Sequence, residues 1–157
     1  MSNLSSAFGT KDQLRIRTFE LNGTTFKVKV PLTSENEAMY ERTKIVNPDL
    51  VEKYYANMSK EFFDNKSKYE NDEQVIFKDN DVILKDISIR ELCNSKVITE
   101  NRITELFKLL IPADENFDMQ NITYQDIDAE FPFNIQTEII EKISEVIAPS
   151  YSVAKGK

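Results

Sequence analysis

The side chains that most often carry out catalysis are scarce in this chain of 157 residues, which has no histidine and a single cysteine, Cys93. Histidine has the unperturbed pKa nearest neutral pH, so it supplies most general acid–base catalysis and many metal ligands. Lys96 follows Cys93 closely and would lower the pKa of its thiol, but no imidazole is present to activate it. We therefore interpret Cys93 as a packed thiol at the end of an apolar helical face.

Carboxylates are frequent, but their spacing does not match that of metal sites or hydrolases. The tripeptide Asp-Asn-Asp at 79–81 resembles the start of a calcium-binding loop, yet the sixth position is Leu84, where such a loop needs glycine. Asp126 and Asp128 could divide acid and base roles as paired carboxylates do in glycosidases, but nothing in the sequence indicates a cleft. The three glycines are scattered, so no phosphate-binding loop is predicted. We predict no enzyme activity, no cofactor and no metal site.

The net charge is −7, and acidic side chains are concentrated toward the C-terminus. Between Ala113 and Ile147 there are nine acidic residues and one basic residue, Lys142. Nucleic-acid binding depends on clustered Lys and Arg, so this charge argues against it. The acidic run is either a solvated face or a contact surface for a basic partner.

The compartment is predicted from what the first residues lack. They contain neither the basic nor the apolar segment of a signal peptide, and no apolar run reaches the ~18 residues that a membrane span requires. A lone cysteine cannot form an internal disulfide. We therefore predict a cytoplasmic protein without membrane contact.

The clearest local pattern is a β-hairpin near the N-terminus. Asn22-Gly23 separates β-rich runs at 14–21 and 24–30, and Asn-Gly tolerates the positive φ angles of a type I′ turn. A two-residue turn pairs Phe19 with Phe26 and places both rings on one face of the hairpin.

Two further strand features are expected. Leu14 and Ile16 alternate onto the face opposite Phe19, which predicts a bulge near Arg17–Thr18. Short β-rich runs at the two ends of the segment 75–84 predict a second hairpin.

Helices are predicted where a capping residue precedes apolar residues at three-to-four spacing. These segments are about twelve residues from Ser34, Asn47 through roughly Asn65, Ser88 to near Asn94, Thr99 to before Pro112, a short turn from Thr123, and a last helix from Phe133 to before Pro149. The segments 67–74 and 114–121 are expected to be loops.

Together these elements predict an α+β fold, mostly helical, with an N-terminal β-hairpin, a second short hairpin and about five helices. We predict a single domain over residues 13–149, between a flexible arm at 1–12 and a flexible tail at 150–157.

Aromatic and isoleucine side chains are the candidates for partner binding. Tyr54/Tyr55 and Phe62/Phe63 are adjacent pairs, and neighbours on a helix point about 100° apart, so one member of each pair can lie at the edge of the apolar stripe. The alternative is that these side chains belong to the core. The residues that we predict to contact a partner are Tyr54, Tyr55, Phe62, Phe63, Phe131, Phe133, Ile139, Ile143 and Ile147.

Three regions resemble tail assembly chaperones of long-tailed (siphovirus-like) bacteriophages. They are the basic hairpin RTFELNGTTFKVKVPLTSENEA, the acidic segment ITYQDIDAEFPFNIQTEIIEKISEVI, and the polar ending. The resemblance implies a small acidic protein that binds the long, apolar tape-measure protein and keeps it soluble until tube subunits displace it. It implies a location in the host cell cytoplasm and absence from the mature virion. The major tail tube protein and a second copy of the chain are further candidate partners.

The resemblance also raises a hypothesis about a longer form. Many such chaperones are extended by a −1 ribosomal frameshift near the end of the short form. The sequence at 155–157 is Lys-Gly-Lys, whose codons can contain the slippery sequence GGGAAAA. Residues 150–157 would then link to an extension, and a gene without that sequence would contradict the hypothesis.

Two other functions remain open. The chain could be a structural head–tail connector or tail-completion subunit, which ring formation would support. It could also be an acidic inhibitor or regulator of a host protein, for which partner binding would be strongly sensitive to salt.

Overall fold

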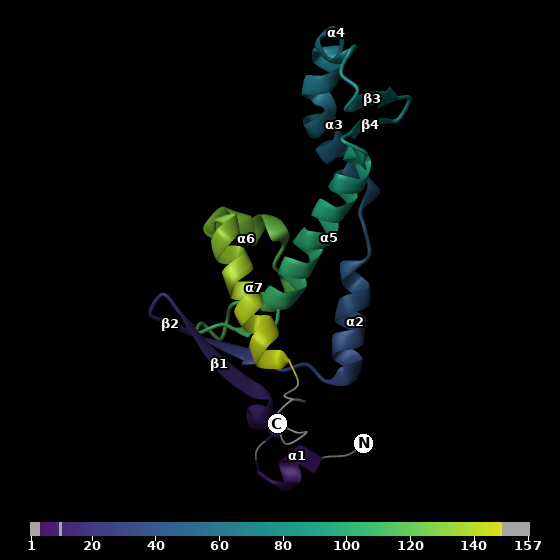
Figure 1. Ribbon diagram of the computed structural model, residues 1–157. Helices are drawn as coiled ribbons and strands as arrows, with labels where there is room; N and C mark the ends of the chain where they lie inside the picture. Colours follow the sequence, from purple (N-terminus) through teal and green to yellow (C-terminus); the bar gives the residue numbers. More distant parts are fainter. Residues whose placement is uncertain (1–3, 10, 149–157) are drawn as a thin grey trace, which may run out of the picture. The chain divides into compact units, whose positions relative to one another are not determined.

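The computed structural model describes residues 4–9 and 11–148 and has the mixed, mostly helical α+β class that the sequence predicts (Figure 1). In chain order the elements are helix α1 (Leu4–Ala7), 3-10 helix η1 (Lys11–Arg15), strands β1 (Ile16–Leu21) and β2 (Thr24–Lys29), helices α2 (Thr33–Thr43), α3 (Pro48–Asp64) and α4 (Lys66–Tyr69), strands β3 (Val75–Lys78), β4 (Asp81–Leu84) and β5 (Ile87–Ser88), helix α5 (Ile89–Phe107), strand β6 (Leu110–Ile111), 3-10 helix η2 (Met119–Asn121), and helices α6 (Tyr124–Glu130) and α7 (Phe133–Ile147).

Where the sequence predicts one domain over 13–149, the chain divides into two compact units. Unit 1 combines the residues up to Tyr40 with those from Arg102 onward, and unit 2 is the continuous segment Glu41–Asn101. Each unit has an apolar core of its own, and this is the physical reason for the division. Hydrophobic periodicity shows which face of a helix is buried but not against which element, so it did not separate the two cores.

The N-terminal hairpin of unit 1 has the predicted turn and register. Asn22 and Gly23 have φ angles of 51° and 81°, and Leu21 pairs with Thr24 across the turn. Phe19 pairs with Phe26, and their rings stack with centroids 5.0 Å apart. The prediction that both phenylalanines share one face is confirmed.

The predicted bulge near Arg17–Thr18 is wrong, because β1 and β2 pair without interruption from Ile16–Lys29 to Leu21–Thr24. Leu14 lies in η1 and is exposed, so the strand has no change of phase to correct. The sequence also gave no indication of β6, whose two residues complete the sheet in the order β1-β2-β6.

Helices α6 and α7 complete unit 1. Thr123 and Asp126 form a capping box at the start of α6, in which each side chain accepts a hydrogen bond from the other residue's backbone N–H. The sequence predicts a short helical turn from Thr123, and this helix start is confirmed. Helix α7 packs its buried face into the core that also contains Phe19 and Val28.

Within unit 2, helix α3 starts where the sequence predicts it. The side chain of Asn47 accepts a hydrogen bond from the backbone N–H of Asp49, 3.0 Å away, and Pro48 occupies the first helical position of α3. The second hairpin, β3–β4, is also confirmed, and β5 extends it into a sheet with the order β3-β4-β5. Helix α4 occupies part of the segment that we expected to be a loop.

Three helix boundaries differ from those predicted. Ser88 caps a helix as expected, but this helix is the single α5, which runs through Thr99 to Phe107 because neither Pro nor Gly interrupts it. Helix α2 begins at Thr33, before the predicted cap Ser34. Of the predicted arm, residues 4–7 are helical, whereas 1–3, residue 10 and the predicted tail at 150–157 lie outside the described residues.

Candidate functional site

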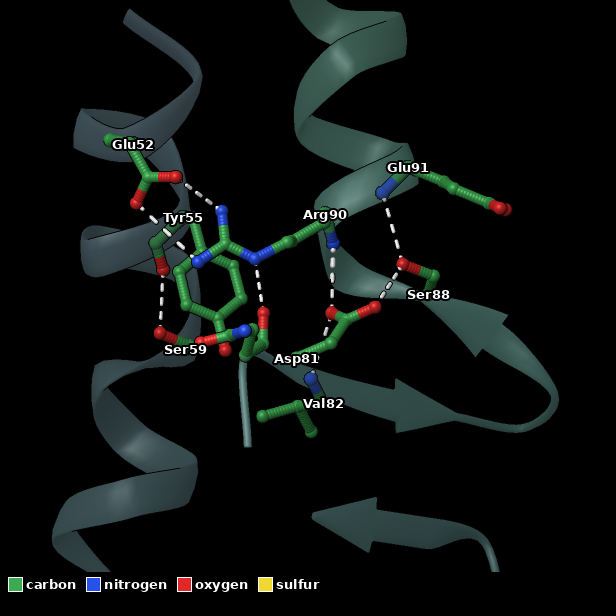
Figure 2. A network of polar contacts seen from close by, with 9 residues as sticks. Glu52, Tyr55, Ser59, Asp81, Val82, Ser88, Arg90 and Glu91 are labelled. Carbon is green, nitrogen blue, oxygen red and sulfur yellow. Dashed lines mark hydrogen bonds and ion pairs between the residues drawn. The ribbon is translucent and has the colours of Figure 1, made fainter. Parts of the chain in front are cut away.

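The most densely connected polar cluster of unit 2 is built around Arg90 at the start of α5 (Figure 2). Its guanidinium donates hydrogen bonds to both carboxylate oxygens of Glu52 on α3, at 2.5 and 3.4 Å, and its Nε donates to the carbonyl of Asn80. The guanidinium carbon lies 3.9 Å from the centroid of the Tyr55 ring. One cation therefore connects α3, the β3–β4 turn and α5, and the Glu52 carboxylate beside it raises the pKa of Arg90.

Asp81, at the start of β4, receives the second set of hydrogen bonds in this cluster. One carboxylate oxygen accepts from the backbone N–H of Val82 at 2.8 Å and of Arg90 at 3.1 Å, and the other accepts from the hydroxyl of Ser88. Burial alone would raise the pKa of Asp81, but the hydrogen bonds from Ser88, Arg90 and Val82 outweigh it and hold that pKa below its usual value. Asp81 therefore stays ionised and holds the start of α5 in place.

This cluster is suited to positioning rather than to proton transfer or nucleophilic attack. Burial raises the pKa of the Tyr55 hydroxyl, and burial likewise raises the pKa of the Cys93 thiol. The sulfur of Cys93 is fully buried, 3.4 Å from the sulfur of Met58. A buried neutral thiol is a poor nucleophile, and this agrees with its interpretation as a packed side chain.

A second polar cluster of unit 2 was not foreseen from the sequence. The carboxylate of Glu100 is only 5% exposed, accepts a hydrogen bond from the hydroxyl of Tyr54 at 2.6 Å, and forms an ion pair with Lys96 at 2.8 Å. Lys96 also lies 4.6 Å from the centroid of the Tyr54 ring. The spacing of Lys96 and Glu100 on one helix was the available signal, but nothing local pointed to Tyr54, 46 residues earlier.

The structure divides the nine predicted partner-binding residues by their exposure. Ile139 and Ile143 are 1% and 0% exposed in the core of unit 1, and Tyr55 is 8% exposed in the core of unit 2. The half-buried members of the set are Tyr54, Phe62, Phe131 and Ile147. Only Phe63 on α3, at 41%, and Phe133 at the start of α7, at 55%, are exposed members of the set, and the ring of Phe63 also contacts the ring of Phe77, with centroids 5.5 Å apart.

Other exposed apolar side chains of unit 2 were not singled out by the sequence analysis. They are Ile45, Met58, Ile76, Ile87 and Leu92. Ile76 lies between Val75 and Phe77 in the run that predicts the second hairpin, and Met58 lies within the predicted helix from Asn47, so the apolar pattern did not show that these side chains are exposed.

The acidic run of the C-terminal segment lies at the surface. All nine of its carboxylates belong to exposed residues, and several have local structural roles. Asp118 accepts a hydrogen bond from the backbone of Gln120, Asp126 caps α6, and Asp128 accepts from the amide of Gln136. Glu138, Glu141 and Glu145 give α7 an acidic outer face.

The described residues were also compared with the arrangements needed for metal binding and for crossing a membrane. Within 4–9 and 11–148, no group of three or more Cys, Asp or Glu side chains is arranged to hold a metal ion. In the same ranges, none of the helices is both long and apolar enough to cross a membrane.

Comparison with known proteins gives no relative: no family model, no curated protein and no solved structure matches this chain.

Proposed function

We propose that this chain is a non-enzymatic tail assembly chaperone of a long-tailed bacteriophage, which binds the tape-measure protein and keeps it soluble in the host cytoplasm during assembly of the tail tube. The observation that carries the proposal is the exposure of Phe63 and Phe133 on two long helices, α3 and α7, whose buried faces pack into separate cores. Exposed aromatic rings on rigid helices are typical anchors for protein partners.

The two aromatic anchors belong to different units. Phe63 lies near the end of α3 in unit 2, and Phe133 is the first residue of α7 in unit 1. An extended apolar client offers many equivalent attachment points, so two anchors on one chaperone increase its effective affinity without requiring one large groove. This arrangement fits a long client chain better than a small folded one.

The charge of α7 fits the second requirement of a chaperone. Its exposed acidic face (Glu138, Glu141 and Glu145) begins five residues after Phe133 on the same helix. Apolar contact at the start of the helix would cover part of the client. Charge along the outer face of the helix would keep the complex soluble.

The test is co-expression of the chain with the tape-measure protein encoded beside it. We expect the tape-measure protein to be soluble with the wild-type chain and to become largely insoluble with the double variant Phe63→Ser, Phe133→Ser. A matched control is Phe117→Ser, because Phe117 is 53% exposed but lies in a loop outside the predicted set. The control should retain the wild-type effect.

Three outcomes would contradict the proposal. The first is a tape-measure protein that is equally insoluble with and without this chain. The second is loss of binding at high salt with no effect of the aromatic variants, which would favour an acidic regulator. The third is the chain's retention in purified mature particles, which would favour a connector or tail-completion subunit.

A further inference from the structure

An open trough with a cavity volume of about 520 Å³ lies in unit 2 between α4 and β3. It is lined by Lys66, Ser67, Tyr69, Glu70, Val75, Ile76 and Phe77. The three strand residues are consecutive, and consecutive side chains of a strand point to opposite faces of the sheet. The wall of the trough is therefore the backbone edge of β3 rather than one of its faces. No residue of β4 lines it, so it lies on the side of β3 that faces away from β4.

The edge of β3 presents backbone groups to this trough. Lys85 donates its backbone N–H to the carbonyl of Gln74 at 2.8 Å, which identifies that pair as hydrogen-bonded. Pairs in an antiparallel ladder alternate between hydrogen-bonded and non-hydrogen-bonded, so the backbone groups of Val75 and Phe77 point away from β4. The N–H of Val75 is used by the carbonyl of Asp72 at 3.2 Å. The N–H of Phe77 and the carbonyls of Val75 and Phe77 remain directed toward the trough.

The two ends of the trough differ in charge. At the end of β3, Lys78 follows Phe77, and the ammonium of Lys66 lies 5.2 Å from the centroid of the Phe77 ring. At the start of β3, Glu70 lines the trough, and Asp72 and Glu73 precede Val75. A bound segment with a carboxylate at the basic end of the trough and a cation at the acidic end would match the charge of each end.

We infer that the free edge of β3 accepts an extended segment of a partner protein as an additional antiparallel strand. The carboxylate of the added segment lies beside Lys66 and Lys78, and its cation lies beside Glu70. Apolar side chains alternate along the middle of the segment. Backbone hydrogen bonds supply the affinity in such strand addition, and the side chains supply the selectivity. A helical segment cannot use this edge, because its backbone groups are bonded internally. The inference does not rest on the proposed chaperone function: the ring of Phe63 contacts the ring of Phe77, with centroids 5.5 Å apart, but the edge that accepts the strand is formed by backbone groups of β3.

The test uses the full chain, labelled with ¹⁵N, and the acetylated and amidated probe peptide Glu-Val-Thr-Val-Thr-Val-Lys. In an antiparallel pairing this probe places its glutamate at the basic end of β3. We expect the probe to shift the amide resonance of Phe77 and to slow its hydrogen exchange at millimolar concentration. Lys66→Glu should weaken binding by roughly two- to fivefold, the range of an exposed ion pair. The peptide Lys-Val-Thr-Val-Thr-Val-Lys should bind this variant more tightly than it binds the wild type.

The matched control is Lys53→Glu, an exposed lysine of α3 outside the trough, which should bind the probe like the wild type. An unmoved Phe77 amide at saturating peptide, or equal binding by wild type and Lys66→Glu, would overturn the inference. A Phe77 amide that is already protected in a dimer without peptide would show that a second copy of the chain occupies the edge, and this too would overturn it.

Discussion

The guanidinium of Arg90 lies flat against the ring of Tyr55, with its central carbon 3.9 Å from the ring centroid. The same group donates hydrogen bonds to Glu52, one turn before Tyr55 on α3. This contact joins the first turn of α5 to α3 within unit 2. Its contribution to stability can be separated into the ring contact and the ion pair, because the two use different partners.

The first prediction compares the contributions of the ring contact and of the ion pair to the stability of the fold. Arg90→Lys keeps the charge but loses the planar stacking and the two-point contact with Glu52, so we expect a loss of about 1 kcal/mol in the free energy of unfolding. Glu52→Gln should cost less, because the Glu52 side chain is 63% exposed and exposed ion pairs contribute little. Urea unfolding followed by circular dichroism measures both. A larger loss for Glu52→Gln than for Arg90→Lys would contradict this assignment.

The second prediction is a pH dependence that arises from Asp81. Its pKa is lower in the folded than in the unfolded chain, so its contribution is fully present above the unfolded value of about 3.9 and is lost as pH falls through the lower folded value. Asp81→Asn should therefore destabilise the protein near neutral pH, and the difference from wild type should shrink with acidification below about pH 4. Urea titrations at several pH values test this. Asp79→Asn, in the adjacent exposed turn, is the control for removing one carboxylate charge from this turn.

The third prediction concerns Gln136, which is fully buried on α7. Its amide accepts a hydrogen bond from the hydroxyl of Tyr124 at 2.9 Å and donates to Asp128 at 3.1 Å and to the carbonyl of Phe131 at 2.8 Å. Gln136→Leu has a similar volume but removes these three hydrogen bonds, so we expect a loss of roughly 1–3 kcal/mol in the free energy of unfolding. Thermal unfolding measures it, and Gln125→Leu on the exposed side of α6 is the control. An unchanged stability would show that water replaces the amide.

The fourth prediction distinguishes core residues from contact residues on α7. Ile139→Ala should lower the free energy of unfolding by about 2–5 kcal/mol, because the side chain is 1% exposed and its removal leaves a cavity. Phe133→Ser should change stability by no more than ~0.5 kcal/mol, because the ring is largely exposed. Chemical unfolding of both variants tests the pair. A large loss for Phe133→Ser would mean that its ring supports the fold rather than a partner.

Features with a local cause were predictable from the sequence. The Asn22-Gly23 turn, the Asn47 cap and the helix start at Thr123 depend on residues within four positions of each other. Features that depend on distant residues were not predictable. Strand β6 exists because Leu110 pairs with Val28, and the division into two units follows from which apolar faces meet.

The candidate site illustrates the same limit. The apolar pattern of α7 placed Ile139, Ile143 and Phe133 among candidate contacts, but only tertiary packing decides that the two isoleucines are buried and the phenylalanine is exposed. The ion pair between Arg90 and Glu52 was missed because the two residues are 38 positions apart. A single sequence carries no signal for such a pairing.

The discontinuity of unit 1 has a consequence for synthesis on the ribosome. The β1–β2 hairpin leaves the exit tunnel first, whereas β6 and α7, which complete its sheet and contribute to the core around Phe19, are made more than eighty residues later. The continuous unit 2 is translated between the hairpin and β6, and it can fold before the remaining elements of unit 1 have been made. During that interval the stacked Phe19 and Phe26 lack their apolar cover, so the nascent chain is most prone to aggregate before α7 emerges.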